Sequence, residues 1–185
     1  MSSFALSLKL VKIKVGKVQM QVPETFEELD AQARSNEYAG KSTPIAVYRS
    51  PRDKSALTIY QVSDSIRMSQ AQEQQKRGYN MSFEKDLNME SAFKKSSIMN
   101  KFQEVTFIQE GVKTINGQEM IVFEFEGITE GKDTRGNSTI SQVYNYMVHC
   151  YDKHHSISIG FICDKRVKED YEEAVAKMMG TIKIK

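Results

Sequence analysis

The most constraining feature of the sequence is an Asn-Gly pair at 116–117, which separates two long runs rich in β-branched and aromatic residues. A two-residue hairpin turn needs positive φ at both central positions, and Asn and Gly tolerate this best. After the pair, apolar residues recur at every second position over 121–125, as on the buried face of a strand. The pattern predicts antiparallel strands over 105–115 and 120–125, followed by a Gly-rich, charged loop over 127–137.

A second predicted hairpin carries both cysteines. Two strands around a polar turn at 152–155 place Cys150 opposite Ile157 and Cys163 opposite Tyr144. The sulfur atoms would then lie six residues apart along the ladder, about 20 Å at about 3.3 Å per residue. A disulfide needs Cα atoms within about 7 Å. We therefore expect two free, buried thiols, which suit a reducing compartment.

The remaining patterns mix strand and helix periodicity, which predicts an α+β fold. We expect an α/β/α sandwich with a mostly antiparallel central sheet and helices on both faces, formed by a single domain over 1–185 in which 1–15 is an N-terminal strand extension. The other predicted elements are a bulged strand, or two strands folding at Gly16, before Pro23; a short helix with a Thr25–Glu28 capping box; strands over 45–48 and 56–62; two helices within 65–102, divided near Gly78; a helix from Asp164 to Gly180; and a last strand over 181–184.

Charge is nearly balanced over the whole chain but is segregated along it. The 26 basic and 24 acidic residues give a net charge of +2, which argues against nucleic-acid binding. Residues 1–22 hold four lysines and no acid, whereas 103–130 hold six acids and one lysine, a net of −5. If these segments pair within one sheet they neutralise each other; if they lie apart, the surface is bipolar and suited to docking a partner.

Membrane and targeting signals are not recognised in the sequence. No stretch of 18 apolar residues is present, so no membrane span is predicted. The first 22 residues alternate like a strand and do not show the apolar run of a signal peptide. We expect a cytoplasmic location for the chain as given, or an envelope location if a leader has been removed.

Three histidines, His149, His154 and His155, are candidates for a zinc site. Adjacent strand residues point to opposite faces, so His149 and Cys150 do not easily ligate one ion. The His154-His155 pair also lacks a metal-ligand spacing. A solvated turn is the favoured interpretation, and no metal or cofactor is predicted.

Glu124 and Glu126 share one face of a predicted strand. Their spacing falls within the roughly 5–9 Å range used for glycoside hydrolysis. Almost any exposed strand with two acids meets that criterion, so a solvated or partner-binding face is favoured. No nucleophile motif and no phosphate-binding loop of correct spacing is present, and we predict a protein without enzymatic activity.

The polar 65–102 region is rich in Met and Phe. Flexible thioethers suit an adaptable binding groove, although filling of the core is the commoner use of Met. The candidates for a partner surface in this region are Met68, Met81, Phe83, Met89 and Phe93.

Three short segments resemble the PsbP-like and DcrB-like family: Val18–Phe26, Val112–Gly117 and Met178–Ile184. They match a strand entering a helix through a "VP…F" step, a hairpin turning on "NG", and a C-terminal helix ending in "M…I.I". The resemblance implies an α/β/α sandwich and a non-enzymatic role. Relatives include an extrinsic photosystem subunit, a Ran-binding nuclear import factor, bacterial envelope lipoproteins and chaperones of type VI secretion effectors. The chain lacks the lipoprotein signal of the envelope members.

We therefore predict a protein-binding adaptor or chaperone-like domain, linked to bacterial secretion, whose partner is another protein or a second copy of the chain. The alternatives are a toxin-immunity protein and a small-ligand or metal-binding domain of the envelope type.

Overall fold

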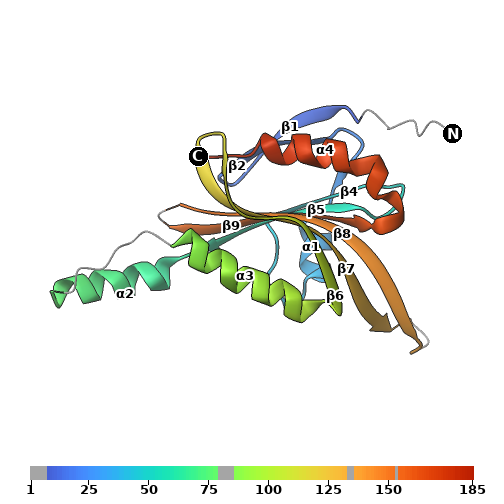
Figure 1. Ribbon diagram of the computed structural model, residues 1–185. Helices are drawn as coiled ribbons and strands as arrows, with labels where there is room; N and C mark the ends of the chain where they lie inside the picture. Colours follow the sequence, from blue (N-terminus) through green and yellow to red (C-terminus); the bar gives the residue numbers. More distant parts are fainter. Residues whose placement is uncertain (1–7, 79–85, 133–135, 153) are drawn as a thin grey trace.

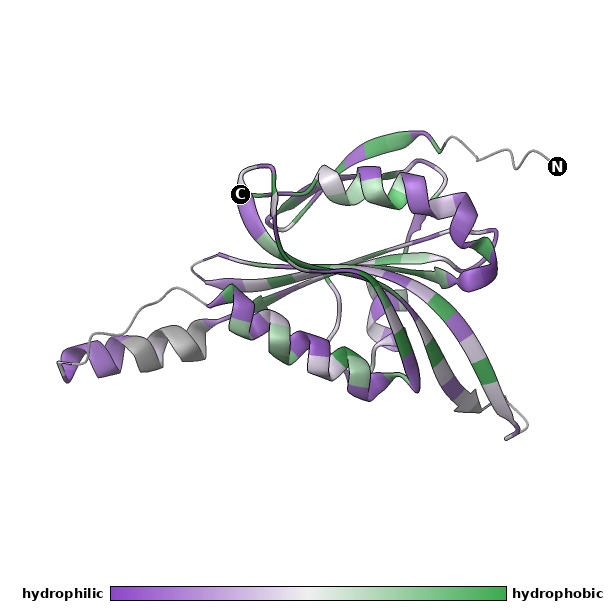
Figure 2. Ribbon diagram, in the orientation of Figure 1, coloured by the Kyte–Doolittle hydropathy of each residue, from purple (hydrophilic) through white to green (hydrophobic). Residues whose placement is uncertain are grey.

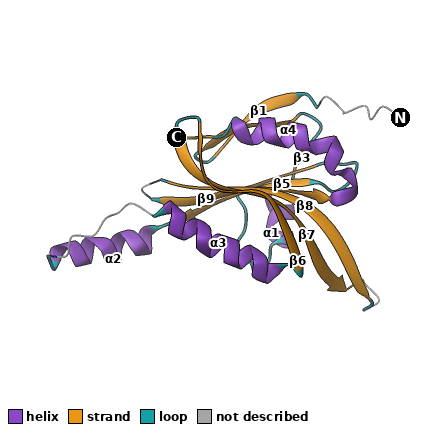
Figure 3. Ribbon diagram, viewed as in Figure 1, coloured by secondary structure: helices purple, strands orange, loops and turns teal. Residues whose placement is uncertain are grey.

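The computed structural model describes residues 8–78, 86–132, 136–152 and 154–185. These residues form antiparallel strands in consecutive runs, separated by helices, which confirms the α+β class (Figure 3). In chain order the elements are β1 Leu10–Val15, β2 Val18–Pro23, β3 Glu27–Glu28, α1 Ala31–Glu37, β4 Ala46–Arg49, β5 Ala56–Ser63, α2 Ser65–Lys76, α3 Leu87–Lys101, β6 Glu104–Ile115, β7 Gln118–Lys132, β8 Ser138–Tyr151, β9 His155–Asp164, the 3-10 turn η1 Lys165–Val167, α4 Lys168–Gly180 and β10 Lys183–Ile184.

The described strands form two sheets. The long sheet has seven strands in the order β3-β4-β5-β9-β8-β7-β6, and a small sheet has the order β1-β2-β10. Every pairing in both sheets is antiparallel. The small sheet and α4 lie on one side of the long sheet, and α3 lies on the other (Figure 1).

Hydrophobic and hydrophilic residues alternate along the strands (Figure 2), and the apolar side chains on the two faces pack into two separate cores. On β7, Met120 and Val122 belong to the core shared with α4 and the small sheet. Their neighbours Ile121 and Phe123 belong to the second core, into which α3 inserts Ile98. Since all five side chains are buried, β7 is covered on both faces over this stretch.

Both predicted hairpins are confirmed. Asn116 and Gly117 have φ values of 49° and 79°, as a two-residue turn requires. The Asn116 amide Nδ2 also donates to the carbonyl oxygens of Gly180, at 2.9 Å, and Ile182, at 2.8 Å, and so ties the turn to the end of α4.

The cysteine hairpin has the predicted register. Cys150 pairs with Ile157, and Cys163 pairs with Tyr144. Both thiols are free and buried, and burial raises the pKa of each to about 12. The thiols are therefore packing groups of low nucleophilicity.

The predicted short helix is present as α1, but the Thr25–Glu28 capping box predicted for its start is wrong. Glu27 and Glu28 form β3, which pairs with Arg49 and Tyr48 of β4. The helix α1 begins at Ala31, where the carboxylate of Asp30 caps it by accepting from the Ala33 N–H. Pairing with an available sheet edge has overridden the local capping signal.

The predicted loop over 127–137 is also wrong for most of its length. β7 continues to Lys132, and β8 begins at Ser138. Its Gly and charged residues are tolerated because this end of the hairpin is exposed, so backbone pairing with β8 is enough to order it. The two strands project beyond α3 as an arm (Figure 1).

The basic and acidic segments do not pair within one sheet. β1 and β2 form the small sheet, whereas the acidic β6–β7 hairpin lies in the long one. Carboxylates of that hairpin form ion pairs with lysines of helical segments. Lys95 of α3 lies 2.7 Å from Glu110. Lys165 of η1 lies 2.6 Å from Glu126, and Lys168 of α4 lies 2.9 Å from it.

None of the helices in the described ranges is both long enough and apolar enough to span a bilayer. The helix α2 is polar and extends away from the sheets (Figures 1 and 2).

Two strand glycines should respond oppositely to the same substitution. A Cβ at Gly127 would lie 2.6 Å from the Phe102 ring, whereas a Cβ at Gly160 would meet nothing within 4 Å. We expect Gly127→Ala to lower the free energy of unfolding by about 1–3 kcal/mol through overpacking. Gly160→Ala should leave it unchanged or raise it by up to about 1 kcal/mol, because Gly is entropically unfavourable in a strand. Urea unfolding of both variants tests this, and equal effects would contradict the described packing.

Candidate functional site

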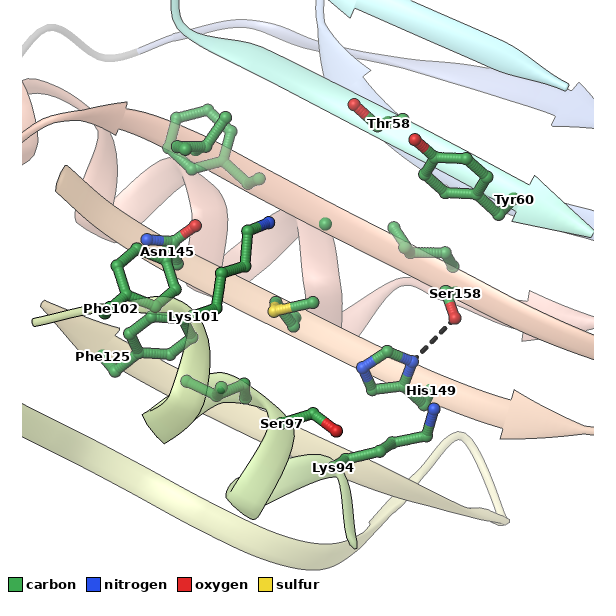
Figure 4. Close-up of a pocket in the computed structure, with 16 residues that line it drawn as sticks. Thr58, Tyr60, Lys94, Ser97, Lys101, Phe102, Phe125, Asn145, His149 and Ser158 are labelled. Atoms are coloured by element: carbon green, nitrogen blue, oxygen red, sulfur yellow. Dashed lines mark hydrogen bonds between the residues drawn. The ribbon is translucent and has the colours of Figure 1, made fainter. Parts of the chain in front are cut away.

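The helix α3 covers only part of its face of the long sheet. It packs over β6 and β7, where the ring of Phe102 contacts Phe125 edge-on at 5.3 Å between centroids. Towards β8, β9 and β5 a cavity of about 370 Å³ opens between the helix and the sheet (Figure 4). Its size falls within the usual range of small-molecule sites, roughly 300–1,000 Å³.

The floor of the cavity consists of rows of paired residues that run across β5, β9 and β8. The register places Tyr60, Ser158 and His149 in one row. The next row holds Thr58, Gly160 and Met147. All six line the cavity.

Because Gly160 has no side chain, open space remains above the backbone in the middle of this floor. This glycine lies inside β9, its φ is not in the left-handed region, and no atom lies within 4 Å of the position of a Cβ. Neither backbone strain nor tight packing therefore requires glycine here. Glycine within a strand is often found where another group approaches the backbone closely.

Asn145 lies in the row beyond, between Ile162 of β9 and Phe125 of β7. The residue is 7% exposed and lines the cavity. Its side-chain Nδ2 is buried and has no hydrogen-bond partner among the described residues. A buried amide group without a partner is destabilising by about 1–3 kcal/mol.

His149 is a neutral, buried imidazole at the other end of the cavity. Its Nδ1 lies 2.7 Å from Oγ of Ser158 (Figure 4). Burial, and secondarily the charge of Lys94, lowers the pKa of His149 to about 3. The ring is therefore a polar hydrogen-bonding group near pH 7.

The charged residues that line the cavity are lysines. Lys94 and Lys101 both come from α3, and none of the described lining residues is an acid. Figure 4 shows Lys101 extending from the helix towards the end of the cavity at which Asn145 lies. The site thus combines apolar walls, neutral polar groups and a positive rim.

The outward face of α3 carries a second notable feature. Met89 and Phe93 are four residues apart, so they lie on one face of the helix, and they are 53% and 63% exposed. Met99 is 55% exposed. This face points away from Ile98, which anchors the helix to the sheet. Solvent exposure at these positions excludes core filling as their role.

The other sequence candidates of this region are not placed. Met68 belongs to α2, but its side chain is not described, and Met81 and Phe83 lie outside the described residues. The partner-surface hypothesis therefore stands on Met89 and Phe93 and stays a prediction.

Glu124 and Glu126 face the side of the sheet opposite α3, where both are engaged. Glu124 accepts from the hydroxyl of Tyr144 at 2.8 Å and from Gln109 at 2.5 Å. Ion pairing with two lysines, Lys165 first, lowers the pKa of Glu126. These contacts show a structural use for both carboxylates.

The structure does not bring the three histidines together. His149 lies on the α3 face of β8, whereas His154 and His155 lie at the β8–β9 turn, where His155 Nδ1 lies 3.1 Å from both carboxylate oxygens of Asp152. Within the described ranges, no cluster of three His, Cys, Asp or Glu residues has a metal-binding arrangement.

The residues that shape the cavity, Asn145, Gly160 and Lys101, were missed by sequence reasoning. One signal was available: the predicted hairpin register already pairs His149 with Ser158 and Met147 with Gly160. A polar and small-residue stripe on one face of two central strands indicates incomplete covering of that face. The covering helix itself could not be placed from the sequence.

Comparisons with solved structures identify the fold. The chain is similar to cyanobacterial PsbP (CyanoP) of Synechocystis, with a TM-score of 0.54 and 8% identity, covering 100% of this chain and 98% of that one. It is also similar to the Ran-binding protein Mog1p of Saccharomyces cerevisiae, with a TM-score of 0.54 and 11% identity, covering 96% of each chain. The chain has the PsbP-like fold. The resemblance noted in the sequence is thus confirmed at the level of the fold.

No protein-family model matches the sequence, and no curated protein is similar enough in sequence to count as a relative.

Asn145→Leu should stabilise the protein. Leucine has a similar volume and removes a buried amide without a partner, so we expect the free energy of unfolding to rise by about 1 kcal/mol. Urea unfolding measures the change. A decrease of similar size would show that the amide makes a stabilising contact in the folded protein.

His149 should make the protein less stable in acid. The unfolded imidazole takes up a proton below about pH 6.5, whereas the folded one does so only near pH 3. The unfolded state therefore binds more protons in this window, and stability falls as the pH falls from about 6.5 to 3. We expect His149→Gln to show a shallower pH dependence in urea unfolding. Identical curves for both proteins would contradict the assignment.

Proposed function

We propose that the chain is a non-enzymatic, protein-binding domain with an α/β/α-sandwich arrangement, and that it binds its partner through the outward face of α3. The observation that carries this proposal is the exposure of Met89 and Phe93 on a helix that is already anchored from its other side. Aromatic residues and Met are enriched in protein interfaces. The PsbP-like fold supports the proposal, since Mog1p, one protein with that fold, is described as Ran-binding.

The occupant that we propose is a different protein with an apolar recess for Phe93. The net charge of α3 does not decide between a different protein and a second copy of the chain, because Lys94 and Lys101 line the cavity on the sheet side of the helix and Lys95 pairs with Glu110. The crosslinking experiment below distinguishes these two occupants.

The finer form of the proposal is an adaptor or chaperone-like role in bacterial secretion, with a toxin-immunity role as the alternative. Both rest on the resemblance found in the sequence, and both require a polypeptide partner. They differ in what that partner is, so identifying it decides between them.

Site-specific photo-crosslinking tests the proposal. A photoreactive phenylalanine analogue at position 93 should give a covalent adduct with one polypeptide other than the chain itself in the source cells. The same analogue at Glu173, which is exposed on α4 on the opposite side of the long sheet, should not give that adduct. Mass spectrometry identifies the adduct, and an adduct with the chain itself would overturn the choice of a different protein.

The purified partner then allows a quantitative test. Replacing Met89 and Phe93 together with Ser should weaken binding by at least about tenfold, roughly 1.4 kcal/mol. Ile140→Ser is the matched control, because it removes an apolar side chain that is 71% exposed elsewhere, on β8. Equal affinities of the double variant and the control would show that α3 is not the interface.

A further inference from the structure

We propose that the cavity between α3 and strands β5, β9 and β8 is a binding site for a small amphipathic carboxylate, a molecule with one anionic group and an apolar body. The inference is independent of the outward face of α3, because the cavity lies on the side of that helix that faces the sheet. It rests on the shape of the floor, an unpartnered buried amide and the charge of the rim.

The floor provides room for an apolar body. Gly160 leaves open space above the centre of β9, although neither its φ nor its packing requires glycine. Met147 beside it and Ile98 of α3 give this part of the cavity apolar walls. Asn145 and His149 are four residues apart on β8, so the cavity extends over about 13 Å at about 3.3 Å per residue. An elongated molecule fits this space better than a compact one.

Asn145 provides a donor for an acceptor group. Its Nδ2 is buried, lines the cavity and has no partner in the part of the chain that the structure describes. An oxygen of a bound ligand at this position would remove the penalty of the unpaired amide. Native structures seldom keep such a group without a partner, so the amide indicates a ligand contact.

The positive charge of the residues at the rim favours an anionic ligand. Lys94 and Lys101 line the cavity, and the described lining residues contribute no carboxylate. Lys101 lies towards the Asn145 end (Figure 4), and its Nζ lies 5.9 Å from the centroid of the Phe102 ring, a contact with an aromatic face and not with a carboxylate. A carboxylate placed there would accept from Asn145 Nδ2 with one oxygen and pair with the Lys101 ammonium with the other.

The neutral His149–Ser158 pair does not disturb this assignment. With its pKa near 3, the imidazole is neutral at neutral pH, and the positive charge near it is that of Lys94. The Asn145 end combines Lys101 with the unpartnered amide donor, so the anionic end of the ligand is directed there, and the apolar body extends over Gly160.

The test is titration of the full-length protein with octanoate, octanamide and octylammonium, followed by calorimetry and two-dimensional amide NMR. We expect saturable binding of octanoate, with the largest shifts at Gly160 and at the Asn145 side-chain amide. Octanamide should bind about tenfold more weakly, and octylammonium more weakly still. Absence of octanoate binding, shifts centred elsewhere or equal affinity for the ammonium compound would each overturn the proposal.

Two variants and two matched controls locate the site. Gly160→Val fills the open floor and should reduce octanoate affinity at least about tenfold, while Thr106→Val, exposed on β6, should not. Lys101→Gln should weaken binding of octanoate but not of octanamide, while Lys12→Gln on β1 should leave the affinity for both compounds unchanged.

Amide spectra establish that each variant is folded. If Gly160→Val fails to fold, the Lys101→Gln comparison decides, and unchanged octanoate binding in that variant would overturn the assignment.

Discussion

Two-sided burial of the strands β7 and β8 is the constraint on which the rest of the structure depends. Every second residue of these strands must be covered on one face and its neighbours on the other. The central part of the face towards α4 is covered by that helix and the small sheet. The face towards α3 is covered by one helix, packed through Ile98 and followed by Phe102, and a cavity remains between it and β5, β9 and β8.

That asymmetry explains where the two candidate binding features lie. A single helix packed on a wide sheet leaves a cavity beside it, and the strands there carry Thr58, Ser158, Gly160 and Asn145 in place of larger apolar residues. The same helix has to face solvent on its other side, where Met89 and Phe93 are not needed for its packing. One helix therefore provides both the wall of a ligand-sized cavity and an exposed apolar surface. The acidic β6–β7 hairpin is used differently: its Glu110 pairs with Lys95 of α3, and its Glu126 pairs with Lys165 of η1 and Lys168 of α4.

Sequence reasoning was accurate where a local pattern has one solution. The Asn116-Gly117 turn, the register of the cysteine hairpin and the division of the helical region near Gly78 all follow from short-range stereochemistry. It failed where two local solutions compete. The Thr25–Glu28 segment matches a capping pattern, but its Glu27 and Glu28 pair with the edge of β4 and form a strand. Glycine and charge over 127–132 indicated a loop, but a neighbouring strand was available to order it.

The sequence by itself determined the α+β class, the hairpins, the free thiols and the resemblance to the PsbP-like family, since each depends on spacing along the chain. Only the tertiary structure decided that the basic and acidic segments lie in different sheets, that Glu124 and Glu126 are engaged, and that His149 is separated from the other histidines. It also decided that Asn145 and Gly160 line a cavity with Lys101. The physical reason is that the cavity lies over the part of the sheet that the covering helix does not contact. The position of that helix depends on packing between residues far apart in the chain.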